Sequence, residues 1–84
     1  MIKLLYFARL REALGTAFEE LALPQGVGTL EDVRVLLASR GGAWAHELAP
    51  GRAFRAAVNQ AVASPATPVK AGDEVAFFPP VTGG

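Results

Sequence analysis

Residues 29–40 read TLEDVRVLLASR, and they decide the fold because this is the one stretch that predicts a long helix. Thr29 is a favourable N-cap residue, and the acidic residues that follow lie in the first turn, where the helix dipole favours negative charge. The next residues, Gly41-Gly42, are expected to stop the helix. Apolar side chains at helical spacing predict one buried side, formed by Leu30, Val33, Leu36 and Leu37. Charged side chains are expected toward the other side, at Glu31, Arg34 and Arg40.

Strands are expected on both sides of this helix along the chain. Apolar or alternating runs bounded by turn residues predict them at Ile2 to Ala8, Ala17 to Leu23, Phe54 to Asn59 and Glu74 to Phe78. Val62 is expected in a short edge piece. Two shorter helices are predicted at Arg9 to Leu14, ended by Gly15, and at Ala43 to Leu48. Within the second, Trp44 is interpreted as a packing residue and His46 as a surface or hydrogen-bonded residue rather than a ligand.

The order of these elements is strand, strand, main helix, strand, strand, which has one helix too few for a doubly wound sheet. It predicts an α+β fold in which a mixed sheet of four to five strands packs on one main helix. With the first and last strands side by side, this is the β-grasp, or ubiquitin-like, arrangement. A ferredoxin-like sandwich would need a second full-length helix. We expect a β-grasp domain at residues 1–78 and an extended C-terminal Gly-Gly tail at residues 79–84.

The composition excludes several classes of function. The 84 residues carry eight basic and eight acidic side chains, and no basic block favours binding to nucleic acid. The apolar runs are shorter than a membrane span, and Met1 leads straight into a strand-like segment rather than a signal peptide. We therefore expect a soluble, cytoplasmic protein with neither a nucleic-acid nor a membrane partner.

Side chains that carry out catalysis are almost absent. The chain has no cysteine, which excludes disulfides, a thiolate nucleophile and cysteine-bound metals. His46 is the only histidine, so a metal site with several histidines cannot form within one chain. Any chemistry of this protein must use something other than a conventional side-chain site.

The alternation of side chains along strands predicts an apolar patch on the face of the sheet away from the main helix. Lys3 and Glu74 mark the solvent side of the first and last strands. If those strands are neighbours, that side also carries Leu5, Phe7, Ala76 and Phe78. Such a patch commonly marks a partner site. The alternative is that a loop or the short Arg9–Leu14 helix folds over it.

The chain ends PPVTGG at residues 79–84, directly behind the predicted last strand. Pro79 and Pro80 cannot donate ladder hydrogen bonds and favour a stiff extended path. The six residues reach about 20 Å when fully extended. Gly83 and Gly84 carry no side chains, so they fit a narrow channel, and the final carboxylate is unhindered. This ending predicts a delivery arm with a reactive end, whereas a frayed terminus would not need the stiff spacer.

Three segments carry a resemblance to a known family. They are MIKLLYFA at residues 1–8 with the Arg11-Glu12 and Leu14-Gly15 pairs that follow, AVNQ at residues 57–60, and DEVAFFPPVTGG at residues 73–84. In this order and over the full length, the chain resembles the molybdopterin synthase small subunit family of ubiquitin-like sulfur carriers. The FFPPVTGG ending is specific to it, whereas Gly-Gly alone is shared by many ubiquitin-like proteins.

The resemblance implies a role for the C-terminal residues in molybdenum cofactor synthesis. Gly84 would be adenylated, converted to a thiocarboxylate, and would donate sulfur to cyclic pyranopterin monophosphate to form the molybdopterin dithiolene. Gly83 would permit insertion of the tail into the partner. The path through the partner's channel would be lined by Pro79, Pro80, Val81 and Thr82. Phe7, Val62 and Phe78 match family positions at the large-subunit interface.

The resemblance also implies which molecules this chain meets. The partners would be the molybdopterin synthase large subunit, an adenylyltransferase similar to ubiquitin-activating enzymes, and a sulfur donor such as a cysteine desulfurase or a rhodanese-like protein. A heterotetramer of two small and two large subunits is expected. No cofactor would be stably bound, since ATP is used by the activating enzyme. The chain would be a sulfur-donating subunit, with the catalytic groups on the large subunit.

Three other functions remain open from the sequence. The chain is compatible with a sulfur carrier for thiamin thiazole synthesis or tRNA thiolation, although thiazole carriers usually have aliphatic residues where this chain has FFPP. It is also compatible with a protein modifier joined through Gly84 to lysines of other proteins. The third is a non-covalent ubiquitin-like interaction module.

Overall fold

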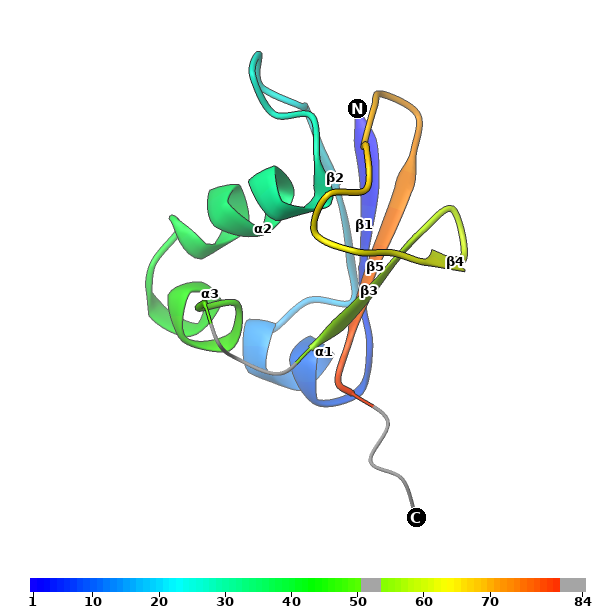
Figure 1. The fold of residues 1–84 in the computed structure, drawn as a ribbon. Helices are drawn as coiled ribbons and strands as arrows, with labels where there is room; N and C mark the ends of the chain where they lie inside the picture. Colours follow the sequence, from blue (N-terminus) through cyan, green and yellow to red (C-terminus); the bar gives the residue numbers. More distant parts are fainter. Residues whose placement is uncertain (51–53, 81–84) are drawn as a thin grey trace.

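The computed structural model describes residues 1–50 and 54–80, which form five strands and three helices. The elements follow one another as β1 (Ile2–Tyr6), α1 (Ala8–Leu14), β2 (Phe18–Leu21), α2 (Leu30–Ala38), α3 (Gly42–Glu47), β3 (Arg55–Val58), β4 (Ala61–Val62) and β5 (Glu74–Phe78). Figure 1 shows the three helices on one side of a single twisted sheet. This is the predicted α+β, β-grasp architecture, with α2 as the main helix.

The sheet has the strand order β2-β1-β5-β3-β4. The first and last strands lie side by side at its centre and run parallel, with Leu4 opposite Val75 and Tyr6 opposite Phe77. All the other strand pairs are antiparallel. The sheet is therefore mixed, and the predicted adjacency of the first and last strands is confirmed.

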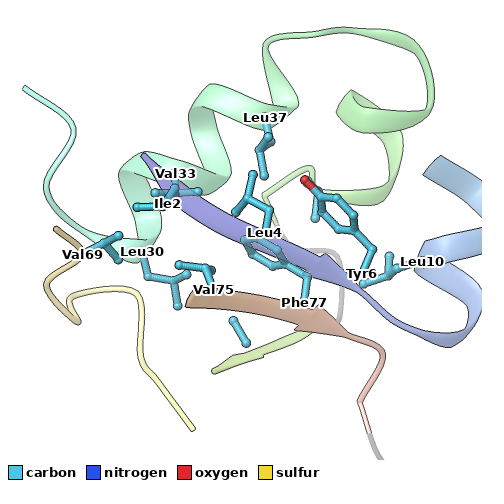
Figure 2. Close-up of a cluster of buried hydrophobic side chains, with 12 residues drawn as sticks. Ile2, Leu4, Tyr6, Leu10, Leu30, Val33, Leu37, Val69, Val75 and Phe77 are labelled. Carbon is cyan, nitrogen blue, oxygen red and sulfur yellow. The ribbon is translucent and has the colours of Figure 1, made fainter. Parts of the chain in front are cut away.

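The core fills the space between the sheet and α2 (Figure 2). From β1, Ile2, Leu4 and Tyr6 are buried on the inner face of the sheet, as their alternation predicts. Val75 and Phe77 of β5 join them, and α2 contributes Leu30, Val33 and Leu37. The aromatic rings of Tyr6 and Phe77 stack with their centroids 6.2 Å apart. Burial of these side chains removes apolar surface from water and supplies the main driving force for the fold.

Helix α2 begins with a capping box. The Thr29 hydroxyl accepts a hydrogen bond from the Asp32 N–H at 3.2 Å, and the Asp32 carboxylate accepts one from the Thr29 N–H at 3.2 Å. Two of the amides that a helix start leaves unpaired are thereby satisfied. The helix ends at Ala38, two residues before Arg40, with Ser39 as its C-cap.

The predicted position of Arg34 on the exposed side of the main helix is wrong. The sequence places it on the exposed side, but the residue is buried. Its Nη1 donates to the backbone carbonyl of Leu48, beyond α3, while Nε and Nη2 donate to the Glu31 carboxylate at 2.8 and 2.6 Å. A buried guanidinium is tolerated here because its hydrogen bonds are made.

The first strand is shorter than predicted. It ends at Tyr6 rather than Ala8, because Ala8 has φ 53 and turns the chain into α1. The end of α1 agrees with the prediction, since Gly15 at φ 75 caps it and donates its N–H to the Arg11 carbonyl. The β2 and β3 strands are likewise found inside their predicted ranges. Trp44 packs against the core and His46 is exposed, as expected.

Candidate functional site

The outer face of the sheet, which the helices leave uncovered in Figure 1, carries a continuous apolar row. The register places Phe18, Leu5, Ala76, Ala57 and Val62 opposite one another across all five strands. Residues directly opposite each other in a sheet point to the same face. Phe18 is 48% exposed and Val62 is 74% exposed, so both ends of the row are open to solvent.

Two aromatic residues extend this row toward the end of the sheet where β5 leaves it. Phe78 is the last residue of β5 and lies opposite Arg55. Phe7 follows β1 and is 46% exposed. Its N–H donates to the Phe77 carbonyl at 3.1 Å, and its carbonyl accepts from the Leu10 N–H at 3.1 Å. Both backbone groups of Phe7 are therefore hydrogen-bonded, the N–H to β5 and the carbonyl to α1. These bonds fix the position of the backbone from which the exposed side chain extends.

The opposite end of the same face is charged. Lys3 lies between Glu20 of β2 and Glu74 of β5 in the register. These three residues mark where the apolar surface stops, so the outer face is polarised. Its aromatic residues lie toward the exit of β5, beside Arg55, and Lys3, Glu20 and Glu74 lie toward the start of β1.

The alternative in which the short helix α1 folds over the patch does not occur. Leu10 of α1 is buried in the core, on the helix side of the sheet. Leu5, Ala76 and Phe78 are partly exposed and Phe7 is exposed, so the predicted outer patch is present. Sequence reasoning missed Phe18 and Ala57 as members of this surface. Only the pairing register reveals that they extend the row, although the alternation in β2 already groups Phe18 with Glu20.

Pro79 and Pro80 follow β5 in an irregular conformation and are half-buried. The predicted tail residues Val81, Thr82, Gly83 and Gly84 lie outside the described residues, so their predicted roles stay predictions. The predicted boundary between a domain at residues 1–78 and a tail at residues 79–84 likewise stays a prediction. Phe7, Val62, Phe78, Pro79 and Pro80 are the predicted site residues that the structure places. Their role in binding a partner also stays a prediction.

A carboxylate with a strongly lowered pKa lies in the turn just before β5. The Asp73 carboxylate accepts hydrogen bonds from the Lys70 N–H at 2.9 Å, from Asn59 Nδ2 at 3.1 Å and from Lys70 Nζ at 3.0 Å. These donors, above all the Lys70 N–H, lower the pKa of Asp73 to about 2. Asn59 Oδ1 in turn accepts from the Glu74 N–H at 3.0 Å. This cluster fixes the entry to β5 and the β3–β4 turn.

No cluster of metal-ligating side chains is found in the part of the chain that the structure describes. Within residues 1–50 and 54–80, no three His, Cys, Asp or Glu side chains gather as a metal site would need. Nor does any helix in these two ranges have the length and apolarity to cross a membrane. What the described residues offer is an exposed apolar face that leads to the C-terminal segment.

Comparisons with known proteins agree with this arrangement. The molybdopterin synthase sulfur carrier subunit of Escherichia coli (strain K12) is 48% identical over 84 residues, which cover all of both chains. The protein of the same name from Haemophilus influenzae (strain ATCC 51907 / DSM 11121 / KW20 / Rd) is 43% identical, again over all of both chains. Among solved structures, the small archaeal modifier protein 1, SAMP1, from Haloferax volcanii is similar with a TM-score of 0.72 and 27% identity, covering 99% of this chain and 98% of that one. The sequence model of the ThiS family matches residues 4–84. This chain belongs to the ThiS family.

Proposed function

We propose that this chain is the sulfur carrier subunit of a molybdopterin synthase. The observation that carries the proposal is structural: the exposed apolar face ends at Phe78, where the chain passes into the PPVTGG segment. A docking surface and a chemically reactive end are therefore consecutive in the chain. The similarity to two full-length relatives with this name supports sulfur as the cargo.

The chemistry takes place on the carboxyl group of Gly84. A carboxylate is ionised at neutral pH and is a poor electrophile. Attack of its oxygen on the α-phosphorus of ATP releases pyrophosphate and forms an acyl-adenylate. A hydrosulfide-level sulfur nucleophile then attacks the acyl carbon, a carbon–sulfur bond forms, and AMP leaves. The product is a thiocarboxylate. Its sulfur bonds to a carbon of cyclic pyranopterin monophosphate in place of an oxygen substituent, and water then cleaves the bond between the acyl carbon and sulfur, which returns Gly84 as a carboxylate. Because the chain has no cysteine, no thiol of its own competes for the sulfur.

The protein acts as a tethered substrate, and the partner enzymes supply the catalytic groups. Phe7, Phe78 and Val62 are exposed or partly exposed and share the outer face, so a large subunit can bury all three at once. Docking of this face places the C-terminal segment at the partner's active site with its orientation fixed. Such positioning makes a reaction between two proteins effectively intramolecular. The adenylyltransferase and the sulfur donor are the other proteins this function needs, in the cytoplasm.

A second candidate function is attachment to lysines of other proteins through Gly84. It is favoured by the similarity to a solved structure whose name is small archaeal modifier protein 1. A carrier for thiazole synthesis or tRNA thiolation would use the same activation chemistry but deliver the sulfur elsewhere.

Reconstitution separates these functions. The chain is incubated with the activating enzyme, ATP and sulfide, and its intact mass should rise by one oxygen-to-sulfur replacement. A chain that ends at Gly83 is the matched control. The large subunit and cyclic pyranopterin monophosphate are then added, and molybdopterin is assayed. A thiocarboxylate that yields no molybdopterin rules out this proposal, and isopeptide-linked lysines in place of sulfur transfer point to the modifier.

A further inference from the structure

A groove of about 600 Å³ opens beside the β3 edge of the sheet, between the start of α2 and the loop that follows β4. Its lining is largely apolar and includes Leu30, Phe54, Ala56, Ala63 and Pro65. None of the functional roles described above uses these residues. The groove is continuous with the outer face, because Val62, Arg55 and Pro80 also line it.

The strand edge beside the groove is only partly paired. The short strand β4 pairs with the second half of β3, where Ala57 lies opposite Val62 and Val58 opposite Ala61. The last contact along this edge is the Ala63 N–H, which donates to the Ala56 carbonyl at 2.9 Å. In an antiparallel ladder the backbone groups alternate sides, so a continuation of β3 to Phe54, the residue before it, would point its groups to the same side as those of Ala56. Within residues 1–50 and 54–80, no backbone hydrogen bond reaches Phe54. Among the described residues, the edge therefore offers the backbone groups of Phe54 where the groove is apolar.

The unneutralised charge of the groove is positive. Arg34 and Glu31 both line it, but they neutralise each other through two hydrogen bonds, of 2.8 and 2.6 Å. Arg55 is exposed and forms no ion pair with another residue among those described. A carboxylate bound beside Arg55 would complement this charge.

We propose that the groove binds an extended, apolar segment of the same protein partner that docks on the outer face, and that an acidic residue of this segment pairs with Arg55. The segment would add to the β3 edge beyond β4, with main-chain bonds supplying affinity and the apolar lining supplying specificity. The partner would thus contact both the outer face of the sheet and the β3 edge beside the groove. The identity of the partner rests on the proposed function; the site itself rests on the groove, the unpaired edge and Arg55.

Binding of the molybdopterin synthase large subunit, measured by calorimetry, tests the proposal. Ala63→Leu fills the groove without adding charge, and Arg55→Gln removes the cation. Each should weaken binding about tenfold, as loss of a central interface contact commonly does. Val35→Leu makes a matched apolar enlargement on the exposed part of α2, outside the groove, and should bind like the parent. Circular dichroism confirms that each variant is folded.

The outcomes separate this proposal from the proposed function. If the parent chain does not bind the large subunit, the proposed function fails and this proposal fails with it. If the parent binds and Phe78→Ala weakens binding, while Ala63→Leu and Arg55→Gln bind like the parent, the docking function stands and the groove proposal is overturned.

Hydrogen exchange supplies a readout that needs no substitution. In the complex, the amide of Phe54 should exchange more slowly than in the free chain, since the added segment would pair with it. Unchanged exchange at Phe54 overturns the proposal. A second outcome also overturns the proposal. If the Phe54 amide exchanges slowly in the free full-length chain but fast in a chain ending at Pro80, the groove is occupied by the protein's own C-terminal residues.

Discussion

Arg40 forms a bidentate ion pair with Glu19: Nη1 donates to Oε2 at 2.9 Å and Nη2 donates to Oε1 at 2.8 Å. The same Oε2 accepts a hydrogen bond from the Tyr6 hydroxyl at 2.9 Å. The guanidinium carbon of Arg40 also lies 4.4 Å from the centroid of the Trp44 ring. The Arg40–Glu19 pair therefore links three elements: Glu19 of β2 binds Tyr6 of β1, and Arg40 packs on Trp44 of α3. Hydrogen bonding to Arg40 lowers the pKa of Glu19, whereas burial raises the pKa of Tyr6 far above its usual range.

Arg40→Ala should lower the free energy of unfolding by about 1–2 kcal/mol at neutral pH, since it removes a charged hydrogen-bond pair and a cation–π contact. Because the pKa of Glu19 is depressed in the folded protein, this pair stabilises the fold above the unfolded pKa of about 4.3 and stops doing so as the pH falls further. The difference between variant and parent should therefore shrink from pH 7 to pH 3 in urea denaturation. Arg11→Ala, at an exposed position, should leave stability near that of the parent. A difference that does not change with pH would exclude Glu19 as the partner that matters.

Asp73→Asn should flatten the acid side of the stability profile. The folded pKa of Asp73 is about 2, below its unfolded value of about 3.9, so its contribution is complete above pH 4 and is lost as the pH falls toward 2. The variant should be less stable than the parent at neutral pH and should lose less stability between pH 4 and pH 2. Thermal melts in steps of pH measure both. Glu12→Gln alters an exposed carboxylate and serves as the control; if it flattens the profile equally, the Asp73 turn is not the source.

Ala8→Gly should stabilise the protein by about 0.5–1 kcal/mol, although glycine usually weakens a helix. Ala8 has φ 53, a left-handed conformation that costs a residue with a Cβ more than it costs glycine. Ala13→Gly in the same helix is the matched control and should destabilise by about 1 kcal/mol, because Ala13 is an exposed helical residue. Chemical denaturation gives both values. Equal losses in the two variants would show that Ala8 is not strained.

Phe78→Ala should weaken binding of the large subunit by about 2 kcal/mol or more, as truncation of aromatic interface anchors commonly does. Val35→Ala removes an exposed apolar side chain from α2, away from the outer face, and should leave the affinity unchanged. Phe18→Ala then measures how far the interface extends across the sheet to β2. Calorimetry with all three variants answers both questions. Unchanged affinity in Phe78→Ala would remove the aromatic end of the outer face from the interface.

Deleting Gly84 should abolish sulfur transfer and leave the fold and the docking affinity largely intact. The core lies between the sheet and α2, and among residues 1–50 and 54–80 the last member of the core cluster is Phe77. Circular dichroism and calorimetry test the fold and the docking, and mass spectrometry tests thiocarboxylate formation. If the shortened chain fails to fold, the C-terminal residues are part of the domain and the carrier interpretation fails.

The central strands were predictable because their signals are local. Strand β5 occupies the predicted residues, Glu74–Phe78, since a turn precedes it and Pro79-Pro80 follows it. Thr29 was equally clear as a helix start. By contrast, Arg34 was assigned to the wrong side because its partner, the Leu48 carbonyl, is distant in sequence and becomes a neighbour only in the folded protein. Alanine has no preference for the left-handed conformation, so the sequence did not indicate that Ala8 would adopt it. The end of β1 at Tyr6 was therefore not predicted.

The candidate site was predictable in part for the same reason. Alternation within β1 and β5 was enough to group Phe7 with Phe78 on one face. Adding Phe18 and Ala57 requires the register between strands, which hydrophobic pattern alone does not specify. The groove beside β3 was not predicted, since it depends on how short β4 is and on how the following loop packs.

Because β1 and β5 run parallel, the amino terminus, where a tag or linker can be attached, lies at the opposite end of the sheet from Phe78. Met1 accepts a hydrogen bond from the Gly72 N–H at 2.8 Å, so the amino terminus is held where β5 begins. Phe78 lies a strand length away, about 16 Å for five residues. A tag, dye or surface linker joined before Met1 therefore leaves the aromatic end of the outer face open to a partner. The same group joined after Gly84 would cap the carboxyl group that the proposed chemistry needs.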